Sequence, residues 1–376
     1  MVFLLIDQIN KGGAEKILKS YASYLKDKGY RIVVLSLFSK NEIEGIECKY
    51  GVARLPDSLL IRIFFMPFIY LKFSFYCFKY RPTALYSFLD LSNILTFLLP
   101  IKCKKIYSIH NKLSIQYKKY NKVIYTFVKS LLKTIYNRTK DNSIIGVSSF
   151  VKKDLVENFS VEPNKFVIIN NRVNLSALNL RKDASCDFFL EKEIFKLGSI
   201  GRFSLQKAQW KIIKACKLLK DDHIPFKFYL IGDGEFRPLL IDLIDKYDLN
   251  NYIEIVPYMD NPFPVFRQLD LLVLSSLYEG SPIVVTEAVN LNVPFIGSRD
   301  ALSEDIFKNN YNDYLYDNLM YSYSDEIQSD DTELYKLIKK CITDSDFRLR
   351  ILDDCSDWIR EDESIMYKEY ESLMKK

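Results

Sequence analysis

The chain of 376 residues contains few histidines and glycines, which limits the chemistry that it can perform. There are two histidines, and the seven cysteines form no C-x-x-C pair and lie near no histidine cluster. Protein zinc sites are built from such closely spaced ligands, so we expect no zinc site. Scattered cysteines also favour reduced thiols, as in a cytoplasmic protein.

A secretory leader and a membrane-spanning run are also lacking. The chain opens with apolar residues 2–6 and reaches Asp7 without a basic leader, so we expect no signal peptide. The segment most similar to a membrane span, residues 59–75, contains Arg62, Pro67 and Lys72. Because each charge at the centre of a bilayer costs roughly 2.5–3.5 kcal/mol, we predict that this segment does not span a membrane.

The charge, a net +5, is divided unevenly along the chain. Residues 1–180 contain 28 Lys and Arg against 12 Asp and Glu, whereas the remaining 196 residues contain 25 against 36. A strongly basic half predicts an anionic partner, which could be a membrane surface, a phosphate-bearing acceptor or a nucleic acid.

Apolar runs of strand length alternate with amphipathic stretches of helix length in both halves of the chain. In the first half, residues 2–6 and 31–37 are expected strands, and residues 14–28 between them have the period of a helix. This alternation predicts the α/β fold class, with two parallel sheets covered by helices. Further strands are expected at residues 84–88, 105–109, 143–147, 166–169, 195–200, 226–231, 253–256, 271–274 and 293–296.

Length and composition favour two domains. A polar, irregular stretch at residues 175–194 marks the expected boundary, giving an N-terminal domain at residues 1–178 and a C-terminal domain at residues 190–354. Periodicity leaves open which domain the last predicted helix, residues 355–376, packs against.

The most informative run is EGSPIVVTE at residues 279–287, which places two carboxylates across a predicted loop-to-helix junction. Ser281 fits the N-cap and Pro282 the first helical position. Free N–H groups at such a helix start can bind a phosphate, with Glu279 and Glu287 nearby for hydroxyl groups. This suits a sugar nucleotide, although the two acids could also be an ordinary loop residue and a helix-dipole residue.

Three other segments place glycine beside polar or charged residues at predicted strand ends. They read GGAE at 12–15, GRF at 201–203 with Gln206 and Lys207 after it, and GDG at 232–234. Glycine at these ends lets the backbone approach a ligand closely. Together with residues 279–287, the segments resemble the retaining glycosyltransferases of the GT-B fold, also called glycosyl transferases group 1 or family 4. The resemblance is dense over residues 195–300 and sparser before them.

The resemblance implies two Rossmann-like parallel-sheet domains facing a central cleft. The N-terminal domain would face the acceptor and the membrane, and the C-terminal domain would bind the nucleotide-sugar donor. Arg202 and Lys207 would bind the donor diphosphate, where fixed cations stabilise the charge of the leaving group. Glu279 would contact the donor sugar and Glu287 the ribose hydroxyls. Other donor-binding residues would be Gly12, Gly13, Gly201, Gly232, Gly280, Ser281, Pro282 and Ile283.

Three features of the N-terminal half bear on the same resemblance. His110 follows the predicted strand 105–109 and matches a family histidine near the reacting sugar, so we assign it to positioning the donor sugar, with a structural histidine as the alternative. Arg172 stands where the family usually has glycine, which leaves the local turn in doubt. Ser148 matches the family pattern and could simply cap a helix.

No metal and no cofactor are expected, the nucleotide-diphosphate sugar being the substrate. Glycosyltransferases of the other main fold bind a divalent cation with Asp-x-Asp after a strand. The one such triplet here, residues 344–346, precedes an amphipathic stretch and predicts a helix start instead.

Residues 59–80 are dense in aromatic side chains and carry basic neighbours, and residues 112–140 are basic with no acid. Aromatic and basic groups favour the membrane interface, so we predict peripheral contact with an anionic surface, on the inner face of the plasma membrane. The alternative is that residues 59–80 form a helix buried in the N-terminal domain.

The function that these features favour is metal-independent, retaining transfer of a hexose or N-acetylhexosamine. The donor would be a nucleotide-diphosphate sugar, and the acceptor a lipid-linked or soluble saccharide in bacterial-type surface polysaccharide biosynthesis. The alternatives are a sugar-nucleotide epimerase of the same fold and a noncatalytic polyanion-binding protein. No nucleic-acid-binding module is apparent, so nucleic acid is not an expected partner.

Overall fold

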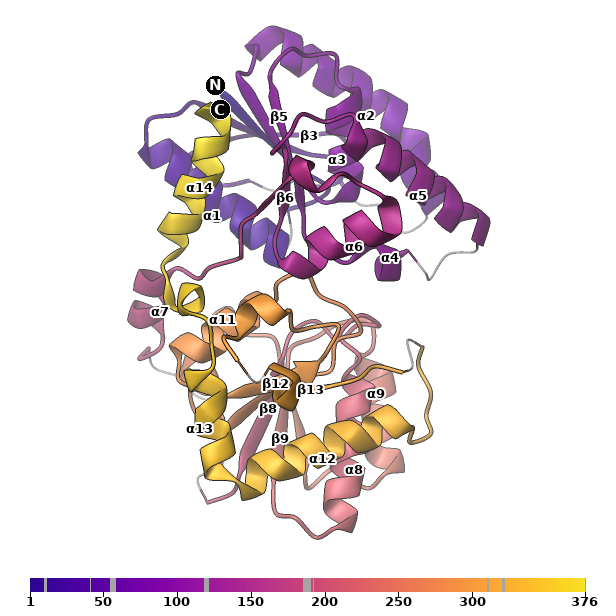
Figure 1. Cartoon of the computed structure of the whole chain (residues 1–376), viewed down its shortest axis with the longest axis vertical. Coiled ribbons are helices and arrows are strands. Elements are labelled where there is room, and N and C mark those ends of the chain that lie inside the picture. The colour runs from indigo at the N-terminus through magenta and orange to yellow at the C-terminus, as the bar shows by residue number, and fades with distance from the viewer. Residues whose placement is uncertain are drawn as a thin grey trace. The chain divides into compact units, whose positions relative to one another are not determined.

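The structure is a computed structural model that describes residues 1–9, 12–40, 42–54, 59–117, 122–184, 191, 193–309, 311–319 and 322–375. The chain forms two compact units, of which the first comprises Met1–Asn171 with Ser364–Lys376 and the second Arg172–Glu363 (Figure 1). The first unit therefore ends a few residues before the predicted boundary. It also receives the C-terminal end of the chain.

The first unit is built on a seven-stranded sheet in which every pairing is parallel, with the order β3-β2-β1-β4-β5-β6-β7. Strands β1, β2 and β4 are buried along their whole length, as expected for a parallel sheet covered on both faces. The strand order reverses between β1 and β4, which pair with Leu4 opposite Tyr86. The strands are β1 (Val2–Ile6), β2 (Ile32–Ser36), β3 (Glu47–Tyr50), β4 (Ala84–Phe88), β5 (Lys104–Ile109), β6 (Ile144–Gly146) and β7 (Phe166–Ile168).

The helices of the first unit bury one apolar face on this sheet. In the first of them, α1, the buried side chains Ile17, Leu18, Tyr21 and Leu25 recur at helical spacing. Ser148 caps α6, because its hydroxyl accepts a hydrogen bond from the N–H of Val151. The helices are α1 (Gly13–Asp27), α2 (Leu59–Tyr80), α3 (Asp90–Leu98), α4 (Leu113–Gln116), α5 (Lys122–Asn137), α6 (Ser149–Phe159) and α14 (Glu363–Lys375), and a 3-10 turn covers Pro163–Lys165.

The second unit repeats this arrangement with a six-stranded parallel sheet in the order β10-β9-β8-β11-β12-β13. Its strand order reverses between β8 and β11. In open α/β sheets, ligands bind outside the carboxyl ends of the strands at such a reversal. The strands are β8 (Lys196–Ile200), β9 (Lys227–Ile231), β10 (Ile253–Val256), β11 (Leu271–Leu274), β12 (Phe295–Ser298) and β13 (Leu315–Tyr316).

Both units therefore have the parallel-sheet, Rossmann-like architecture that the alternation of apolar runs predicts. The triplet at residues 344–346 is a helix start, as predicted, because the Asp344 carboxylate caps α13 at the N–H of Phe347. The helices of the second unit are α7 (Leu175–Arg181), α8 (Gln209–Asp221), α9 (Arg237–Lys246), α10 (Phe263–Phe266), α11 (Ile283–Asn290), α12 (Ser329–Thr343) and α13 (Ser345–Asp353), with 3-10 turns at Glu304–Ile306, Tyr311–Tyr314 and Asp357–Arg360.

The C-terminal end is not the single helix that was predicted. After α13 the chain makes the 3-10 turn Asp357–Arg360, and α14 begins at Glu363. Helix α14 is held in the first unit by aromatic packing, with the Tyr370 ring 5.1 Å from that of Tyr21. The hydroxyl of Tyr86 also donates to the backbone carbonyl of Tyr370.

Arg172 explains the turn that departs from the family pattern. Its guanidinium donates from Nε and Nη2 to Glu361 Oε2, over 3.0 and 2.8 Å. The N–H of Glu363 donates to the Val173 carbonyl. These bonds join residues 172–173 to residues 361–363, where the chain returns toward the first unit. Arg172 therefore has a structural role at a position where the family usually has glycine.

Candidate functional site

Two loops leave the carboxyl ends of the adjacent strands β8 and β11, at the reversal of strand order in the second unit. The first loop contains Gly201, Arg202 and Lys207, and the second contains Glu279 and Gly280. Because parallel neighbours end at the same edge of a sheet, these residues are brought together although they are far apart in sequence.

Lys207 and Glu279 form an ion pair between the two loops. The distance from Lys207 Nζ to Glu279 Oε1 is 2.5 Å, and the side chains are 26% and 9% exposed. At this exposure the pair is only partly solvated, so its attraction is screened less than that of a surface pair. The sequence predicted both residues for the site, but it did not predict that they bind each other.

Hydrogen bonds hold the two loops in register around this pair. Gln206 Nε2 donates to the Tyr278 carbonyl over 3.0 Å, and its contact with Glu279 Oε2 is longer, at 3.4 Å. The hydroxyl of Ser275 donates to the Lys207 carbonyl, and the Leu277 N–H to the Gln206 carbonyl, both over 2.8 Å. These hydrogen bonds between the two loops therefore help to fix the positions of the Lys207 ammonium and the Glu279 carboxylate.

Arg202 lies on the same loop as Lys207, but its side chain is exposed. No described residue forms an ion pair or hydrogen bond with its guanidinium, although Gln209 Nε2 donates to its backbone carbonyl over 3.0 Å. A guanidinium in this state can engage a phosphate with two parallel N–H bonds.

Gly232 has a structural reason for being glycine that the sequence did not reveal. A Cβ atom on Gly232 would lie 2.0 Å from the Gly201 carbonyl oxygen, and its φ is +148°. The N–H of Phe203 donates to the Asp233 carbonyl over 2.9 Å. Gly232 therefore allows the loop after β9 to pack on the loop after β8, and the predicted approach of both glycines to a ligand stays a prediction.

Helix α11 begins one residue later than predicted. Its N-cap is Pro282, with extended backbone and no side-chain cap, so the predicted N-cap Ser281 and the predicted first helical residue Pro282 are both wrong by one position. Ile283 is the first helical residue, and Glu287, 8% exposed, lies within the helix. Pro282 thus gives the start of α11 no side-chain cap, and a helix start of this kind suits an anion.

The remaining predicted residues belong to the first unit. Gly12 is the N-cap of α1, and Gly13 is its first helical residue, one position before the predicted helix start. A Cβ atom on Gly12 would lie 2.2 Å from Glu15 Oε2, so the absence of a side chain there makes room for the Glu15 carboxylate. Residues 10 and 11 lie outside the described part of the chain.

His110 lies immediately after β5 and is half-buried. Its Nε2 atom is 3.0 Å from the hydroxyl oxygen of Ser108, and its ring stacks on Phe88 at 5.8 Å between centroids. Burial lowers the pKa of the imidazole to about 4, so the ring is neutral at pH 7. A neutral ring is compatible with the predicted role in positioning the donor sugar and also with a structural histidine.

Two carboxylates at the same edge of the first sheet were missed. Asp7 follows β1 and accepts hydrogen bonds from the N–H and hydroxyl of Ser92, over 2.8 and 2.6 Å. Asp90 begins α3 and accepts from the side chains of Gln116 and Tyr117. Burial raises the pKa of Asp7 to about 7 and that of Asp90 to about 6. The sequence pattern that could have identified them is an acidic residue at or just after the end of a buried strand.

The arrangement of possible metal ligands and the cavity beside Lys207 complete the description of the site. Among the described residues, no group of three or more His, Cys, Asp or Glu side chains is arranged to hold a metal ion. A small cavity of about 10 Å³ lies between Lys207, Ser199 and Ser275. It has room for about one water molecule, so this cavity cannot itself hold a sugar nucleotide.

Two family models match the chain, one for each half. Residues 11–177 match Glycosyltransferase Family 4, and residues 183–350 match Glycosyl transferases group 1. The two matched segments include every residue predicted for the site, from Gly12 to Glu287.

Three known proteins illustrate the similarity. An uncharacterized glycosyltransferase of Methanocaldococcus jannaschii is 32% identical over 206 residues, which cover 52% of this chain and about half, 49%, of that protein. The N-acetylgalactosamine-N,N'-diacetylbacillosaminyl-diphospho-undecaprenol 4-alpha-N-acetylgalactosaminyltransferase of Campylobacter jejuni is 24% identical over 318 residues, 81% of this chain and 84% of that protein. The crystal structure of Anabaena HepE in complex with UDP-glucose superposes with a TM-score of 0.74 at 17% identity, covering 100% of both chains, and bears on the fold alone.

The parallel-sheet units, the ion pair at the strand reversal and the two matching models agree with one another. The family models and the names of the relatives favour a glycosyltransferase over the noncatalytic and epimerase alternatives. The chain belongs to the glycosyl transferases group 1, and it is a glycosyltransferase of the GT-B fold.

Proposed function

We propose that this protein transfers a hexose or N-acetylhexosamine from a nucleotide-diphosphate sugar to a lipid-linked saccharide, with retention of anomeric configuration and without a metal ion. The main support for this proposal is the ion pair between Lys207 and Glu279. It lies where the strand order of the second unit reverses, and hydrogen bonds join the two loops that contain it. The Campylobacter relative, whose name describes transfer to a diphospho-undecaprenol saccharide, supports this acceptor class.

The charged groups of the second unit suit the diphosphate of the donor. Arg202 and Lys207 supply two cations, and the start of α11 supplies N–H groups without a side-chain cap. As the bond between the sugar and the diphosphate breaks, both electrons leave with the phosphate oxygen, and nearby cations stabilise the growing charge. These groups stabilise the charge of the leaving diphosphate, as a divalent cation does in other transferases.

Retention follows from attack on the face that the diphosphate leaves. The acceptor hydroxyl bonds to the anomeric carbon, and its proton passes to the departing phosphate oxygen. This step requires no covalent nucleophile, and Lys207 Nζ binds Oε1 of Glu279. The carboxylate instead fixes the ammonium and offers its other oxygen, Oε2, to sugar hydroxyls.

A panel of nucleotide sugars tests this proposal directly. Ligand at 100 times its Kd stabilises a protein by about 2.7 kcal/mol, so the donor should raise the melting temperature clearly. We expect one nucleotide sugar to stabilise the protein and to be hydrolysed slowly, equally well in EDTA. The anomeric configuration of the transferred sugar, measured by NMR, should match that of the donor. Stabilisation by no nucleotide sugar, dependence on a metal, or inversion would contradict the corresponding part of the proposal.

We further propose that helix α2 carries a membrane contact suited to a lipid-linked acceptor. Among the described helices, none combines the length and apolar content needed to cross a membrane. Yet α2 exposes apolar side chains at alternating spacings of three and four, on the face opposite the buried Ile69, Phe73 and Cys77. We call this row the α2 stripe, and it consists of Ile61, Phe64, Phe68, Leu71, Phe75 and Phe78, 48–78% exposed.

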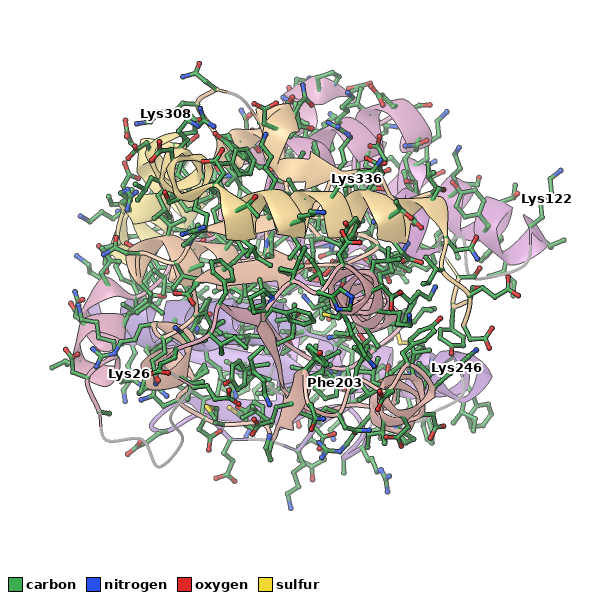
Figure 2. The ribbon with its side chains drawn as sticks, turned by 90° about the horizontal axis from the view of Figure 1, so that it is seen from below. Lys26, Lys122, Phe203, Lys246, Lys308 and Lys336 are labelled. Atoms are coloured by element: carbon green, nitrogen blue, oxygen red, sulfur yellow. The ribbon has the colours of Figure 1, made fainter. Side chains whose placement is uncertain are left out.

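A second helix of the first unit, α5, has a similar character. Val123 and Phe127 are 78% and 68% exposed, and α5 contains lysines but no acid. Lys122, at its start, projects away from the ribbon (Figure 2). Helix α2 also lacks acids. Exposed aromatic and aliphatic groups with basic neighbours match an anionic membrane surface, where each basic group adds about 1 kcal/mol.

Vesicle flotation tests whether the partner of the α2 stripe is an anionic membrane. The protein should float with vesicles that contain anionic lipid, and less with neutral vesicles or at high salt. Heptad-like spacing could instead pair two copies of the chain, so the mass in solution should be measured by light scattering. A dimer that excludes vesicles, or absence of binding to anionic vesicles, would overturn the membrane assignment.

A further inference from the structure

A chain of contacts links the C-terminal helix α14 to His110 within the first unit. The hydroxyl oxygen of Tyr370 is 3.3 Å from that of Ser108, which is in turn 3.0 Å from His110 Nε2. The Phe88 ring stacks on both ends of this chain, 6.3 Å from Tyr370 at an interplanar angle of 6° and 5.8 Å from His110. Tyr370 therefore reaches the histidine by hydrogen bonds and by ring packing.

We propose that Tyr370 is a positioning residue, which donates to Ser108 so that Ser108 donates to His110 Nε2 and leaves Nδ1–H directed to substrate oxygen. This inference rests on the proposed function only for the identity of the substrate. The hydrogen-bond relay itself is a property of the first unit.

The count of donors fixes the direction of the relay. Tyr370 Oη has no other hydrogen-bond partner among the described residues, and the residue is fully buried. If Ser108 donated to Tyr370, the phenolic hydrogen would be left without an acceptor, which costs about 1–3 kcal/mol for a buried group. In the proposed direction, the hydroxyl hydrogens of Tyr370 and Ser108 both have acceptors.

The ionisation of the two end groups agrees with this direction. Burial raises the pKa of the Tyr370 phenol to about 12, so the group keeps its hydrogen at neutral pH. Burial lowers the pKa of His110 to about 4, so one ring nitrogen is an acceptor. Which nitrogen carries the hydrogen is then set by the bond that the other nitrogen makes.

The strand geometry explains why Ser108 can perform this task. Ser108 and His110 are two positions apart at the end of β5, so their side chains lie on the same side of the sheet. Ser108 is fully buried, whereas His110 is half-buried. The relay therefore runs from the core of the unit to its surface, and the C-terminal helix becomes part of the substrate-positioning apparatus.

The presence of only two histidines makes the test direct. Protein labelled with 15N-histidine is compared by NMR for the native chain and for the variants Tyr370→Phe, Ser108→Ala and Tyr86→Phe. His223 serves as an internal reference, since it lies in an exposed turn. Tyr86→Phe is the matched control, because it removes a hydroxyl that binds the Tyr370 backbone carbonyl without touching the relay.

We expect His110 to be in the Nδ1–H tautomer in the native chain and in Tyr86→Phe, and to shift toward the Nε2–H tautomer in Tyr370→Phe and Ser108→Ala. In transfer assays, Tyr370→Phe should lower kcat about tenfold, with a smaller change in KM for the donor. An Nε2–H tautomer in the native chain, or an unchanged tautomer in Tyr370→Phe, would overturn the relay. Since the spectra need no substrate, failure of the relay is distinguishable from failure of the proposed reaction.

Discussion

Lys207 and Glu279 neutralise each other across two loops, with 2.5 Å between Nζ and Oε1. The cation assigned to the diphosphate and the carboxylate assigned to the sugar therefore depend on each other for their position. The pairing also lowers the cost of keeping Glu279 ionised at 9% exposure. Removing either partner is then expected to change both the chemistry and the stability of the fold.

Lys207→Ala should lower kcat on the order of 10²–10³-fold, because a fixed cation at the leaving group is lost. It should also lower the free energy of unfolding by about 1–3 kcal/mol, since Glu279 keeps its charge in a partly buried place without its partner. Steady-state kinetics and urea denaturation measure the two effects. An active Lys207→Ala enzyme would remove the assigned role.

Combining Lys207→Ala with Glu279→Gln separates stability from catalysis. The amide carries no charge to leave unpaired, so the double variant should recover most of the lost stability. Turnover should stay low, because the cation is still missing and an amide replaces the carboxylate assigned to the sugar. If turnover returned with stability, Lys207 would act only by neutralising Glu279, and the diphosphate role would pass to Arg202.

Gly232→Ala should destabilise the second unit by about 2–4 kcal/mol, through a clash with the Gly201 backbone and a strained φ. Gly29→Ala is the matched control, because Gly29 also has a positive φ but nothing lies within 4 Å of its Cβ position. The control should cost only about 1 kcal/mol. Equal losses in thermal or urea unfolding would show that loop packing is not the reason for Gly232.

Most of the fold could be predicted because most elements have a local sequence pattern, although the short edge strands β3 (Glu47–Tyr50) and β13 (Leu315–Tyr316) were not predicted. Buried parallel strands are continuous apolar runs, and the helices between them carry a regular apolar face, so β1, α1 and β2 were found within one or two residues. The ends of helices were predicted less accurately than the helices themselves. Pro282 fits both an N-cap and a first helical position, and only the backbone conformation distinguishes the two.

The site could be predicted only in part, because its critical contacts join distant residues. Motif spacing identified Lys207 and Glu279, whereas their ion pair depends on β8 and β11 being neighbours in the sheet. The close approach that requires Gly232 likewise comes from the packing of two loops. Ser108 and Tyr370 carry no motif, and only the docking of α14 places one near the other.

Asp7→Asn should stabilise the protein at pH 8 but have little effect near pH 4. Burial raises the pKa of Asp7 to about 7, above its ordinary value of 3.8, so the fold favours the protonated form. The stability that this protonation contributes is therefore present at low pH and is lost as the pH rises from about 4 through 7. Asparagine keeps the Oδ1 acceptor for Ser92 but cannot ionise.

The expected gain for Asp7→Asn at pH 8 is on the order of 2 kcal/mol, measured by urea denaturation across pH. Asp27→Asn provides an exposed control at the end of α1. A gain for Asp7→Asn that is the same at pH 4 and pH 8 would contradict the raised pKa of this carboxyl group.

Arg172→Gly restores the residue that is usual in the family and should still lower the free energy of unfolding. The substitution removes both bonds to Glu361 and adds the backbone entropy of glycine, for about 1–2 kcal/mol together. Arg172→Lys should recover part of this loss, because an ammonium keeps the charge but not the paired N–H geometry. Full stability of Arg172→Gly in denaturation experiments would show that the bridge contributes nothing.

Negative charges introduced on the α2 stripe should weaken membrane binding without harming the fold. Phe64→Glu and Leu71→Glu replace side chains that are 78% and 68% exposed, so little packing is lost. Each change removes apolar contact and adds repulsion from anionic lipid, and together they should reduce flotation at least tenfold. Leu349→Glu is the control, since that side chain is 61% exposed on α13 of the second unit. If Leu349→Glu reduced flotation as much as the α2 variants, nonspecific charge would explain the binding and the stripe would have no special role.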